Sequence, residues 1–303
     1  MYFHFIKYQK IFYSLSIILV GLSIVSIFLF GLKLDIDFTG GSSLELNFKN
    51  QVPSLEELRK SLGSLNLGEI SIQTIGDKGI ILKMKDIGEE THQEILKILA
   101  SKEAIEEGSE SFQSIGPVIG QELKRKIKIV VFLTLPAILI YVALSFRRIS
   151  RPVKSYVYGL AGIFALCHDC LIPLGALAIL GRFHGVEITI PIVTAFLTVF
   201  GYSINDTVVV FDRIRENLLK SKEATFELSV EKSLNQTFVR SVNTSLTVIF
   251  VLFAIFFLGG ETLKYFSLTL ILGIFFGTYS SIFLATPLVV TFYKFRERKY
   301  KRD

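Results

Sequence analysis

The uncharged stretch IFYSLSIILVGLSIVSIFLFGL, at residues 11–32, decides the fold class of this protein. A helix rises about 1.5 Å per residue, so about 20 apolar residues cross the roughly 30 Å hydrocarbon core of a bilayer. The 22 residues of this stretch are too many for the apolar part of a signal peptide, and no small-x-small cleavage site follows them. We therefore expect a membrane-spanning helix that stays in the protein.

Five more apolar blocks have the length of a spanning helix, at residues 129–146, 155–181, 188–211, 241–260 and 265–293. Half of the 303 residues are hydrophobic, the mean hydropathy is +0.52, and only 20% are charged, which excludes an intrinsically disordered chain. Two cysteines and four histidines predict neither a disulfide framework nor a metal cluster. The sequence therefore predicts an α-helical polytopic membrane protein with six spanning helices.

Lysine and arginine set the orientation of such a chain, because they accumulate in the cytoplasmic loops. With the N-terminus in the cytoplasm, the inner segments carry 18 of these residues, whereas the two short outer loops carry one each, Arg182 and Lys264. Both termini are therefore predicted to be cytoplasmic. The net charge of +6 reflects this bias, and no basic patch is interleaved with aromatic residues, so we expect contact with membrane lipids and none with nucleic acid.

Residues 33–126 separate the first two spans and have the pattern of a small soluble domain. The predicted strands are residues 43–48, 69–75, 79–85 and 111–115, and the predicted helices are residues 54–62, opened by a capping box, and 89–101. The order β-α-β-β-α-β is that of a ferredoxin-like α+β domain. We therefore divide the chain into residues 1–32, with the first span, 33–126, outside the cytoplasm, and 127–303, with five spans and a cytoplasmic tail.

The outer domain contains no nucleophile–base constellation and no metal-ligand spacing. We therefore expect no enzymatic activity and no cofactor.

A charge inside a span costs at least about 2.5 kcal/mol to insert, so each such residue is a candidate functional residue. Asp206 lies in the inner half of the fourth span, directly after Asn205. A carboxyl group in a medium of low dielectric can hold or lose a proton as its partner moves. This favours an ion relay at Asp206 over a purely structural carboxylate.

Arg240, at the inner end of the fifth span, is the natural partner of Asp206. It shares one helix face with Asn243, Thr244 and Thr247, which follow at steps of three and four residues. We expect this polar face to point into the helix bundle. The alternative is an arginine that snorkels to the cytoplasmic surface, and the spacing alone favours that alternative.

His168 and Asp169 lie in the middle of the third span, between Cys167 and Cys170. One dithiol does not complete a zinc site, and a redox Cys-x-x-Cys belongs in a βαβ unit, so we interpret the cysteines as small packing residues. His168 and Asp169 are interpreted as a buried polar pair, with a secondary relay as the alternative.

Glycines border the outer domain on both sides: Gly40 and Gly41 lead in, and Gly116 and Gly120 lead out. Ordinary turns at a domain boundary explain them. A pair of hinges that lets the domain swing relative to the membrane explains them equally well.

Several of these segments resemble the SecF family of bacterial protein-export membrane proteins, which is related to the resistance–nodulation–division (RND) transporters. GYSINDTVVVFDRIREN, at residues 201–217, is similar to the family's fourth-span signature, and RSVNTS, at 240–245, to its fifth-span signature. DFTGG at 37–41, GPVIG at 116–120 and the His168-Asp169 pair also fit. The sister protein SecD differs at the fourth-span motif, and the resemblance to SecF covers essentially the whole chain.

The resemblance implies a subunit that pairs with SecD in the bacterial inner membrane, associates with the SecYEG channel, and uses the proton-motive force to draw preproteins outward. It implies that Asp206 is the relay carboxylate and Arg240 its cationic partner, with Asn205, Asn243 and Thr244 as the adjacent relay residues. The outer domain would move with the translocating polypeptide. The coupling ion, H⁺ or Na⁺, stays open.

Two functions of other classes remain as alternatives. One is an RND-type exporter of small molecules, which needs large porter regions that a six-span half with a small outer domain lacks. The other is a scaffold that stabilises a membrane complex without using an ion gradient, in which Asp206 is only structural.

Overall fold

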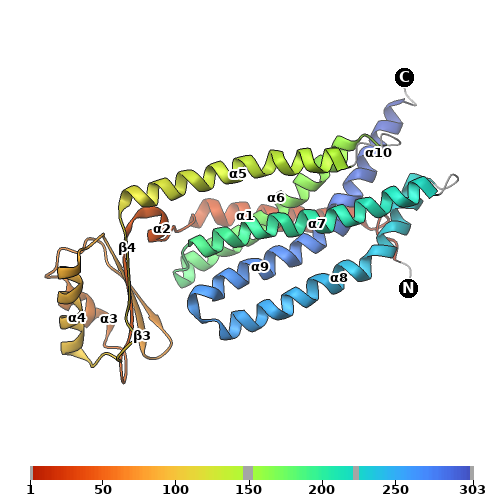
Figure 1. Cartoon of the computed structure of the whole chain (residues 1–303). Helices are drawn as coiled ribbons and strands as arrows, with labels where there is room; N and C mark the ends of the chain where they lie inside the picture. The colour runs from red at the N-terminus through yellow and green to blue at the C-terminus, as the bar shows by residue number, and fades with distance from the viewer. Residues whose placement is uncertain (1–2, 146–152, 221–224, 301–303) are drawn as a thin grey trace. The chain divides into compact units, whose positions relative to one another are not determined.

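The computed structural model describes residues 3–145, 153–220 and 225–300. The chain divides into two compact units (Figure 1). One comprises Met1–Leu32, Val130–Val186 and Pro191–Asp303, and we call it the helical unit. The other comprises Lys33–Ile129 together with the short segment Glu187–Ile190, and we call it the sheet unit.

The sheet unit is built from four strands and three short helices. Along the chain these are α2 (Ile36–Thr39), β1 (Gly41–Asn47), α3 (Leu55–Leu62), β2 (Ser71–Ile75), β3 (Gly79–Met84), α4 (Glu89–Lys102) and β4 (Ser111–Ile115). The strands lie in the order β2-β3-β1-β4 and every neighbouring pair is antiparallel. The helices α3 and α4 lie on one face of this sheet (Figure 1). This is the predicted ferredoxin-like arrangement, and α2 is the one described element of the unit that the sequence pattern did not predict.

Local sequence explains these elements. Ser54 caps α3, because its hydroxyl oxygen accepts the backbone N–H of Glu57 at 3.2 Å. In β1 the side chains alternate: Leu44 and Leu46 are fully buried and Glu45 is exposed. The buried leucines pack in one core with the apolar faces of α3 and α4.

Within the described residues, six helices are long and apolar enough to cross a membrane, which confirms the predicted number. These are Gln9–Phe30, Pro117–Leu144, Ser155–His184, Ile190–Lys220, Phe226–Leu258 and Leu263–Arg298. They correspond to α1 (Gln9–Phe30), α5 (Pro117–Ser145), α6 (Ser155–His184), α7 (Ile190–Lys220), α8 (Phe226–Leu258) and a last span that combines α9 (Gly260–Ser280), η1 (Ser281–Ala285) and α10 (Thr286–Tyr300).

Three of these helices are longer than the apolar blocks that predicted them. The helix α5 begins at Pro117, α7 continues to Lys220, and α8 begins at Phe226. Hydropathy identifies only the apolar part of a helix, so it does not detect polar turns at either end. Proline at the first position of α5 is favourable, because the N–H it lacks has no partner there in any helix.

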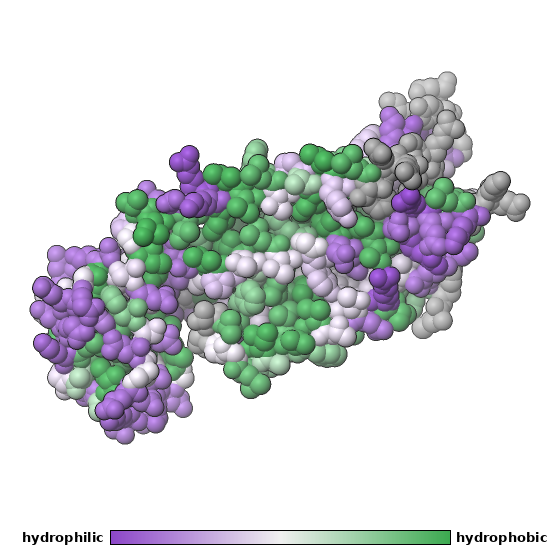
Figure 2. Space-filling model, in the orientation of Figure 1, coloured by the Kyte–Doolittle hydropathy of each residue, from purple (hydrophilic) through white to green (hydrophobic). Residues whose placement is uncertain are grey.

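Apolar side chains cover much of the face of the helical unit that Figure 2 shows. Phe28 on α1, Phe132 on α5 and Leu258 on α8 are 89%, 75% and 86% exposed. Such a surface is expected of helices whose solvent is lipid. The share of buried residues is largest in α6, α7 and the last span, and it is smallest in α1, α5 and α8.

Small residues bring the central helices close together. A Cβ atom on Gly273 of α9 would lie 2.2 Å from a methyl carbon of Val199 on α7, and one on Gly175 of α6 would lie 2.5 Å from the Cα of Ser23 on α1. Close approach at small residues is the usual way in which helices associate in a membrane.

The last span changes its winding part of the way along. Between α9 and α10, Ser281–Ala285 form one π-helical turn. The Thr286 hydroxyl donates to the Ser281 carbonyl at 2.8 Å, which satisfies one backbone group at this turn. Wider turns of this kind are rare and are frequent at functional sites.

A charged cluster ties the segment before α7 to the sheet. The Lys83 ammonium on β3 donates to Asp35 at 2.5 Å and to Glu187 at 2.6 Å. Burial alone would lower the pKa of Lys83, but the two carboxylates outweigh it and the pKa of Lys83 is raised. Alongside, the N–H of Ile188 donates to Lys33 O at 2.7 Å and the N–H of Ile190 to the Asp37 carboxylate at 2.9 Å.

Candidate functional site

Asp206 lies on the buried side of α7, with 8% of its surface exposed. Two serine hydroxyls hold its carboxylate: Ser241 on α8 donates to one oxygen at 2.7 Å, and Ser281 in the π-helical turn donates to the other at 2.5 Å. A hydroxyl is both donor and acceptor, so the same serines can satisfy an ionised carboxylate and a protonated carboxyl group. Neither charge state of Asp206 therefore has to leave a buried hydroxyl without a partner.

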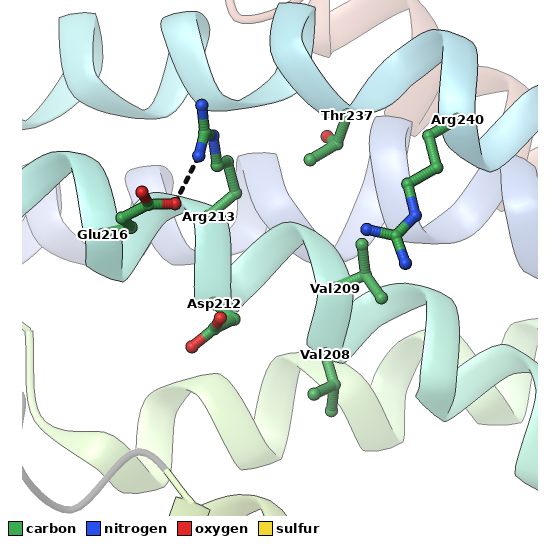
Figure 3. Close-up of a pocket in the computed structure, with 7 residues that line it drawn as sticks. All are labelled: Val208, Val209, Asp212, Arg213, Glu216, Thr237 and Arg240. Atoms are coloured by element: carbon green, nitrogen blue, oxygen red, sulfur yellow. Dashed lines mark hydrogen bonds and ion pairs between the residues drawn. The ribbon is translucent and has the colours of Figure 1, made fainter.

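The sequence left two positions open for Arg240, beside Asp206 or at the cytoplasmic surface. Among the described residues, no ion pair within 4.0 Å joins Arg240 to Asp206. Its sequence neighbour Ser241 makes the contact instead. The Arg240 side chain is exposed and reaches from α8 toward Val209 on α7 (Figure 3).

The Arg240 side chain lines a pocket between α7 and α8 (Figure 3). The pocket has a volume of about 370 Å³, and its lining is Val208, Val209, Asp212, Arg213, Glu216, Thr237 and Arg240. Arg213 and Glu216 form an ion pair on its wall. Four of the seven lining residues are charged, and the pocket lies on the same two helices as Asp206 and Ser241, in the C-terminal half of α7.

Asp169 forms a second buried carboxylate site, on α6. Its exposed fraction is 0%, and three donors surround it: Ser203 of α7 at 2.6 Å, Ser280 of α9 at 2.7 Å and the His168 Nδ1 atom at 2.9 Å. His168 is also buried, stacks on the Tyr279 ring with 5.8 Å between the centroids, and leaves its Nε2 atom without a partner among the described residues.

The polar face of α8 does not point into the helices of this chain. Asn243 and Thr244 are exposed, as is Asn205 on α7. Thr244 donates only to the Arg240 carbonyl of its own helix, at 2.8 Å. The side of α8 that does face inward carries Ser241 and Ser245, four residues apart and both buried. The periodicity of the polar residues indicates a helix face that avoids lipid, but it does not say which neighbour covers that face.

The glycines that border the sheet unit lie against one another. Gly40 and Gly41 have φ angles of 77° and 142°, which favour glycine. A Cβ atom on Gly40 would lie 2.6 Å from Pro117 Cα, and one on Gly120 would lie 2.9 Å from Gly40 N. Gly116 has more room, since the nearest atom to its Cβ position is 3.9 Å away. Gly40 and Gly120 are thus needed for a close contact between the chain entering and the chain leaving the unit.

No local pattern in the sequence links the serines to the two carboxylates, although Ser203 and Ser241 lie inside the segments that resemble the fourth- and fifth-span signatures. Serine is frequent in spans and usually bonds a carbonyl of its own helix, as Ser267 does with Leu263 at 2.8 Å. The pair Ser280-Ser281 could have been singled out only as two adjacent hydroxyls in an apolar block. Three or more His, Cys, Asp or Glu side chains that could hold a metal do not come together within the described residues.

Comparison with known proteins gives this arrangement a family. The C-terminal model of the protein export membrane proteins SecD/SecF matches residues 95–295, and the SecD/SecF GG motif matches residues 25–52. The protein translocase subunit SecF of Thermobaculum terrenum is 40% identical over 298 residues, covering 94% of this chain and 92% of its own length.

Two solved structures of SecDF are similar to this chain. The crystal structure of SecDF from Thermus thermophilus, described as a translocon-associated membrane protein, matches with a TM-score of 0.83 and 34% identity over 96% of this chain. A SecDF structure in a super-membrane-facing form matches with a TM-score of 0.71 and 32% identity over 100% of this chain. The chain spans 39% and 40% of the lengths of these two proteins. The matched models, the similarity over nearly the full length of a SecF relative and the shared fold show that this chain belongs to the SecD/SecF family of protein export membrane proteins.

Proposed function

We propose that this chain is the SecF-type subunit of an accessory complex of the Sec protein translocase. It pairs with SecD in the bacterial inner membrane, with both termini in the cytoplasm, and associates with the SecYEG channel. The complex uses the proton-motive force to promote export of preproteins. The relatives named as translocase subunits and the SecDF structures support this assignment.

The observation that carries the proposal is the Asp206 carboxylate, buried in a span and held by hydroxyls from two other spans. In this proposal Asp206 is the proton-relay residue, and Arg240, Asn205, Asn243 and Thr244 form the coupling site beside it. Movement of one charge through 100 mV supplies about 2.3 kcal/mol, which is enough to shift a two-state equilibrium roughly fifty-fold. His168 and Asp169 form a secondary site on the neighbouring helix.

The exposed polar residues of α7 and α8 support a partner inside the membrane. Asn205, Arg240, Asn243 and Thr244 all lie in helices long and apolar enough to span, yet their side chains are exposed in the single chain. Polar groups facing hydrocarbon are unfavourable, so such residues normally face protein or a water-filled cavity. A second six-span chain of the same family, SecD, would cover this face.

Movement of α7 can be passed to the sheet unit through the chain itself. The helix that carries Asp206 begins at Ile190, and the N–H of Ile190 donates to Asp37 in the DFTGG segment. Lys83 and Glu187 add a second connection directly before the helix. A displacement of α7 would therefore act on the strand β3 that carries Lys83.

Translocation in inverted membrane vesicles tests the proposal. Vesicles that contain this chain with its SecD partner should take up preprotein faster when a proton gradient is imposed, and vesicles lacking the chain should show no such stimulation. A sodium gradient is applied in parallel to identify the ion. Equal uptake with and without each gradient, in vesicles where the complex co-purifies with the channel, would favour the scaffold. Gradient-driven efflux of small molecules without an effect on preprotein would favour the exporter.

A further inference from the structure

The last span contacts both intramembrane carboxylates through two consecutive residues. Ser280, the last residue of α9, donates to Asp169 on α6 at 2.7 Å, and Ser281, the first residue of the π-helical turn, donates to Asp206 on α7 at 2.5 Å. Both serines have an exposed fraction of 0%. Neighbouring residues of a helix do not share a face, so this one turn is in contact with two different helices at once.

Each of these serines has a second acceptor within reach. The Ser281 hydroxyl lies 3.0 Å from the Thr278 carbonyl, and the Ser280 hydroxyl lies 3.1 Å from the Gly277 carbonyl. A serine that lost its carboxylate could therefore keep a hydrogen bond to its own helix, and its release would not leave a buried donor without a partner. The contacts between this turn and the carboxylates are thus reversible ones.

The two carboxylates differ in how firmly they are held. Asp169 is fully buried and has three donors, from His168, Ser203 and Ser280. Asp206 retains 8% exposure and has two donors. The charged pocket lined by Arg240 and Thr237 lies on the same pair of helices as Asp206. Asp206 is therefore the less enclosed carboxylate, and Asp169 is the more firmly held one.

We propose that Ser281 is a positioning residue that reports the charge of Asp206 to the last span, while Asp169 anchors the adjacent Ser280. With Asp206 ionised, the Ser281 hydroxyl donates to the carboxylate and the π-helical turn is held against α7. With Asp206 protonated, the hydroxyl turns to the Thr278 carbonyl, and α7 and the last span can move apart. This inference rests on the proposed function, since it names the residue through which the relay acts.

The substitution Ser281→Ala, in the full chain with its SecD partner, tests the inference. A hydroxyl donor favours the ionised carboxylate, so its loss favours the protonated form. Gradient-driven preprotein uptake is measured as a function of pH at a constant pH difference across the vesicle membrane. The midpoint of this profile should move to higher pH by about one unit in Ser281→Ala. His168, Asp169, Tyr202, Arg240 and Tyr279, the titratable groups around the site on α6, α7, α8 and α9, are left unchanged.

Ser267→Ala is the matched control, because Ser267 is equally buried on the same span and its hydroxyl donates to carbonyls of its own helix. Its profile should keep the midpoint of the wild type. If Ser281→Ala does not assemble, Ser281→Cys is measured instead; the thiol is a weak donor of similar shape, and the shift should have the same direction. A lower rate at an unmoved midpoint, or an equal shift in Ser267→Ala, overturns the inference.

Failure of this inference differs from failure of the proposed function. If the unsubstituted chain gives no gradient stimulation, the proposed function is wrong. If it does give stimulation, and the Ser281 variants keep its pH midpoint, only the role of Ser281 is wrong.

Discussion

In the proposed function, single residues within the spans decide how the protein responds to an ion gradient. The sequence predicted a functional role for Asp206, because a carboxylate in an apolar block is costly to insert into a membrane. It did not predict the hydroxyls of Ser241 and Ser281 that hold it. Arg240 was expected to be the partner of Asp206, with snorkelling as the alternative that its spacing favoured, and its side chain lines a pocket between α7 and α8. A charged residue can be recognised in an apolar block from the sequence alone. The role of a serine can be recognised only when the fold shows which residues it contacts.

The contrast between the two carboxylates leads to a prediction for Asp169. Asp169→Ala removes a fully buried acceptor of Ser203 and His168, whereas Ser280 keeps the Gly277 carbonyl. Each buried polar group that loses its partner costs about 1–3 kcal/mol. We expect the purified complex with SecD to unfold at a clearly lower temperature in thermal denaturation. Asp212→Ala, which removes an exposed carboxylate paired with Arg215 at 3.5 Å, is the control and should leave that temperature nearly unchanged. Equal melting temperatures for both variants would show that Asp169 is not an anchor.

Individual elements were predicted in kind but not in detail. The strands and helices of the sheet unit follow from alternation, a capping serine and helical spacing, all of which are local signals. The π-helical turn at Ser281 has no such signal, because the hydropathy of an apolar block is the same whether its residues form an α-helix or a π-helical turn. The glycines before and after the unit were recognised, but their close contact joins residues far apart in the sequence and needed the fold.

The close contact at Gly40 predicts that a side chain there destabilises the sheet unit for two reasons. One is the lack of space, and the other is the positive φ angle. Gly40→Ala places a Cβ atom 2.6 Å from Pro117 Cα at a φ of 77°. Gly76→Ala is the matched control, since Gly76 has a φ of 57° and nothing within 4 Å of its Cβ position. We expect the control to destabilise the sheet unit by about 1 kcal/mol, and Gly40→Ala by about 1–3 kcal/mol more. Hydrogen exchange at the β1 amides in the intact chain measures both.

A hinge at this position predicts the opposite order of effects. If Gly40→Ala destabilises the unit no more than Gly76→Ala, yet lowers preprotein export, the glycines serve as hinges rather than as a packing contact.

At the scale of the whole molecule, the sequence predicted the six spans and the intervening α+β domain. It did not predict the contacts between segments that lie far apart in the sequence. Six apolar blocks and one intervening soluble domain correspond to the six spans and the four-stranded sheet. Glu187 was expected in a short outer loop and residues 188–190 in the fourth span, but the segment Glu187–Ile190 belongs to the sheet unit. Its attachment depends on Lys83, more than 100 positions away, and no local pattern indicates such a contact.

This attachment predicts a local effect of replacing Lys83. Lys83→Met removes the ammonium that joins Asp35 and Glu187, and it leaves two neighbouring carboxylates that repel one another. The groups are half-buried, so we expect a loss of about 1.4 kcal/mol, which corresponds to roughly tenfold faster hydrogen exchange of the Ile188 amide. Lys85→Met, two residues further along the chain and exposed, should leave this amide as slow as in the wild type. Equal exchange in the two variants would contradict a role for Lys83.

The pH dependence of this contact follows from the raised pKa of Lys83. A cation whose pKa is raised on folding contributes its full stability below its ordinary value of 10.5 and loses it as the pH rises through the folded value. Protection of the Ile188 amide should therefore be constant through neutral pH and fall only above about 10.5.

The central claim is that the charge of Asp206 couples an ion gradient to export, and the substitution Asp206→Asn tests it most directly. The amide keeps the shape and can still bond Ser241 and Ser281, but it cannot titrate. Glu227→Gln is the matched control, because it makes the same chemical change at the Glu227–Lys294 pair, whose nearest charged atoms lie 3.7 Å apart, away from the carboxylate site. Preprotein uptake into inverted vesicles is compared with and without a gradient. We predict that Asp206→Asn assembles with SecD and loses at least nine-tenths of the gradient stimulation, about a tenfold effect, while Glu227→Gln retains it. Full gradient stimulation in Asp206→Asn would contradict the relay and leave a structural scaffold in its place.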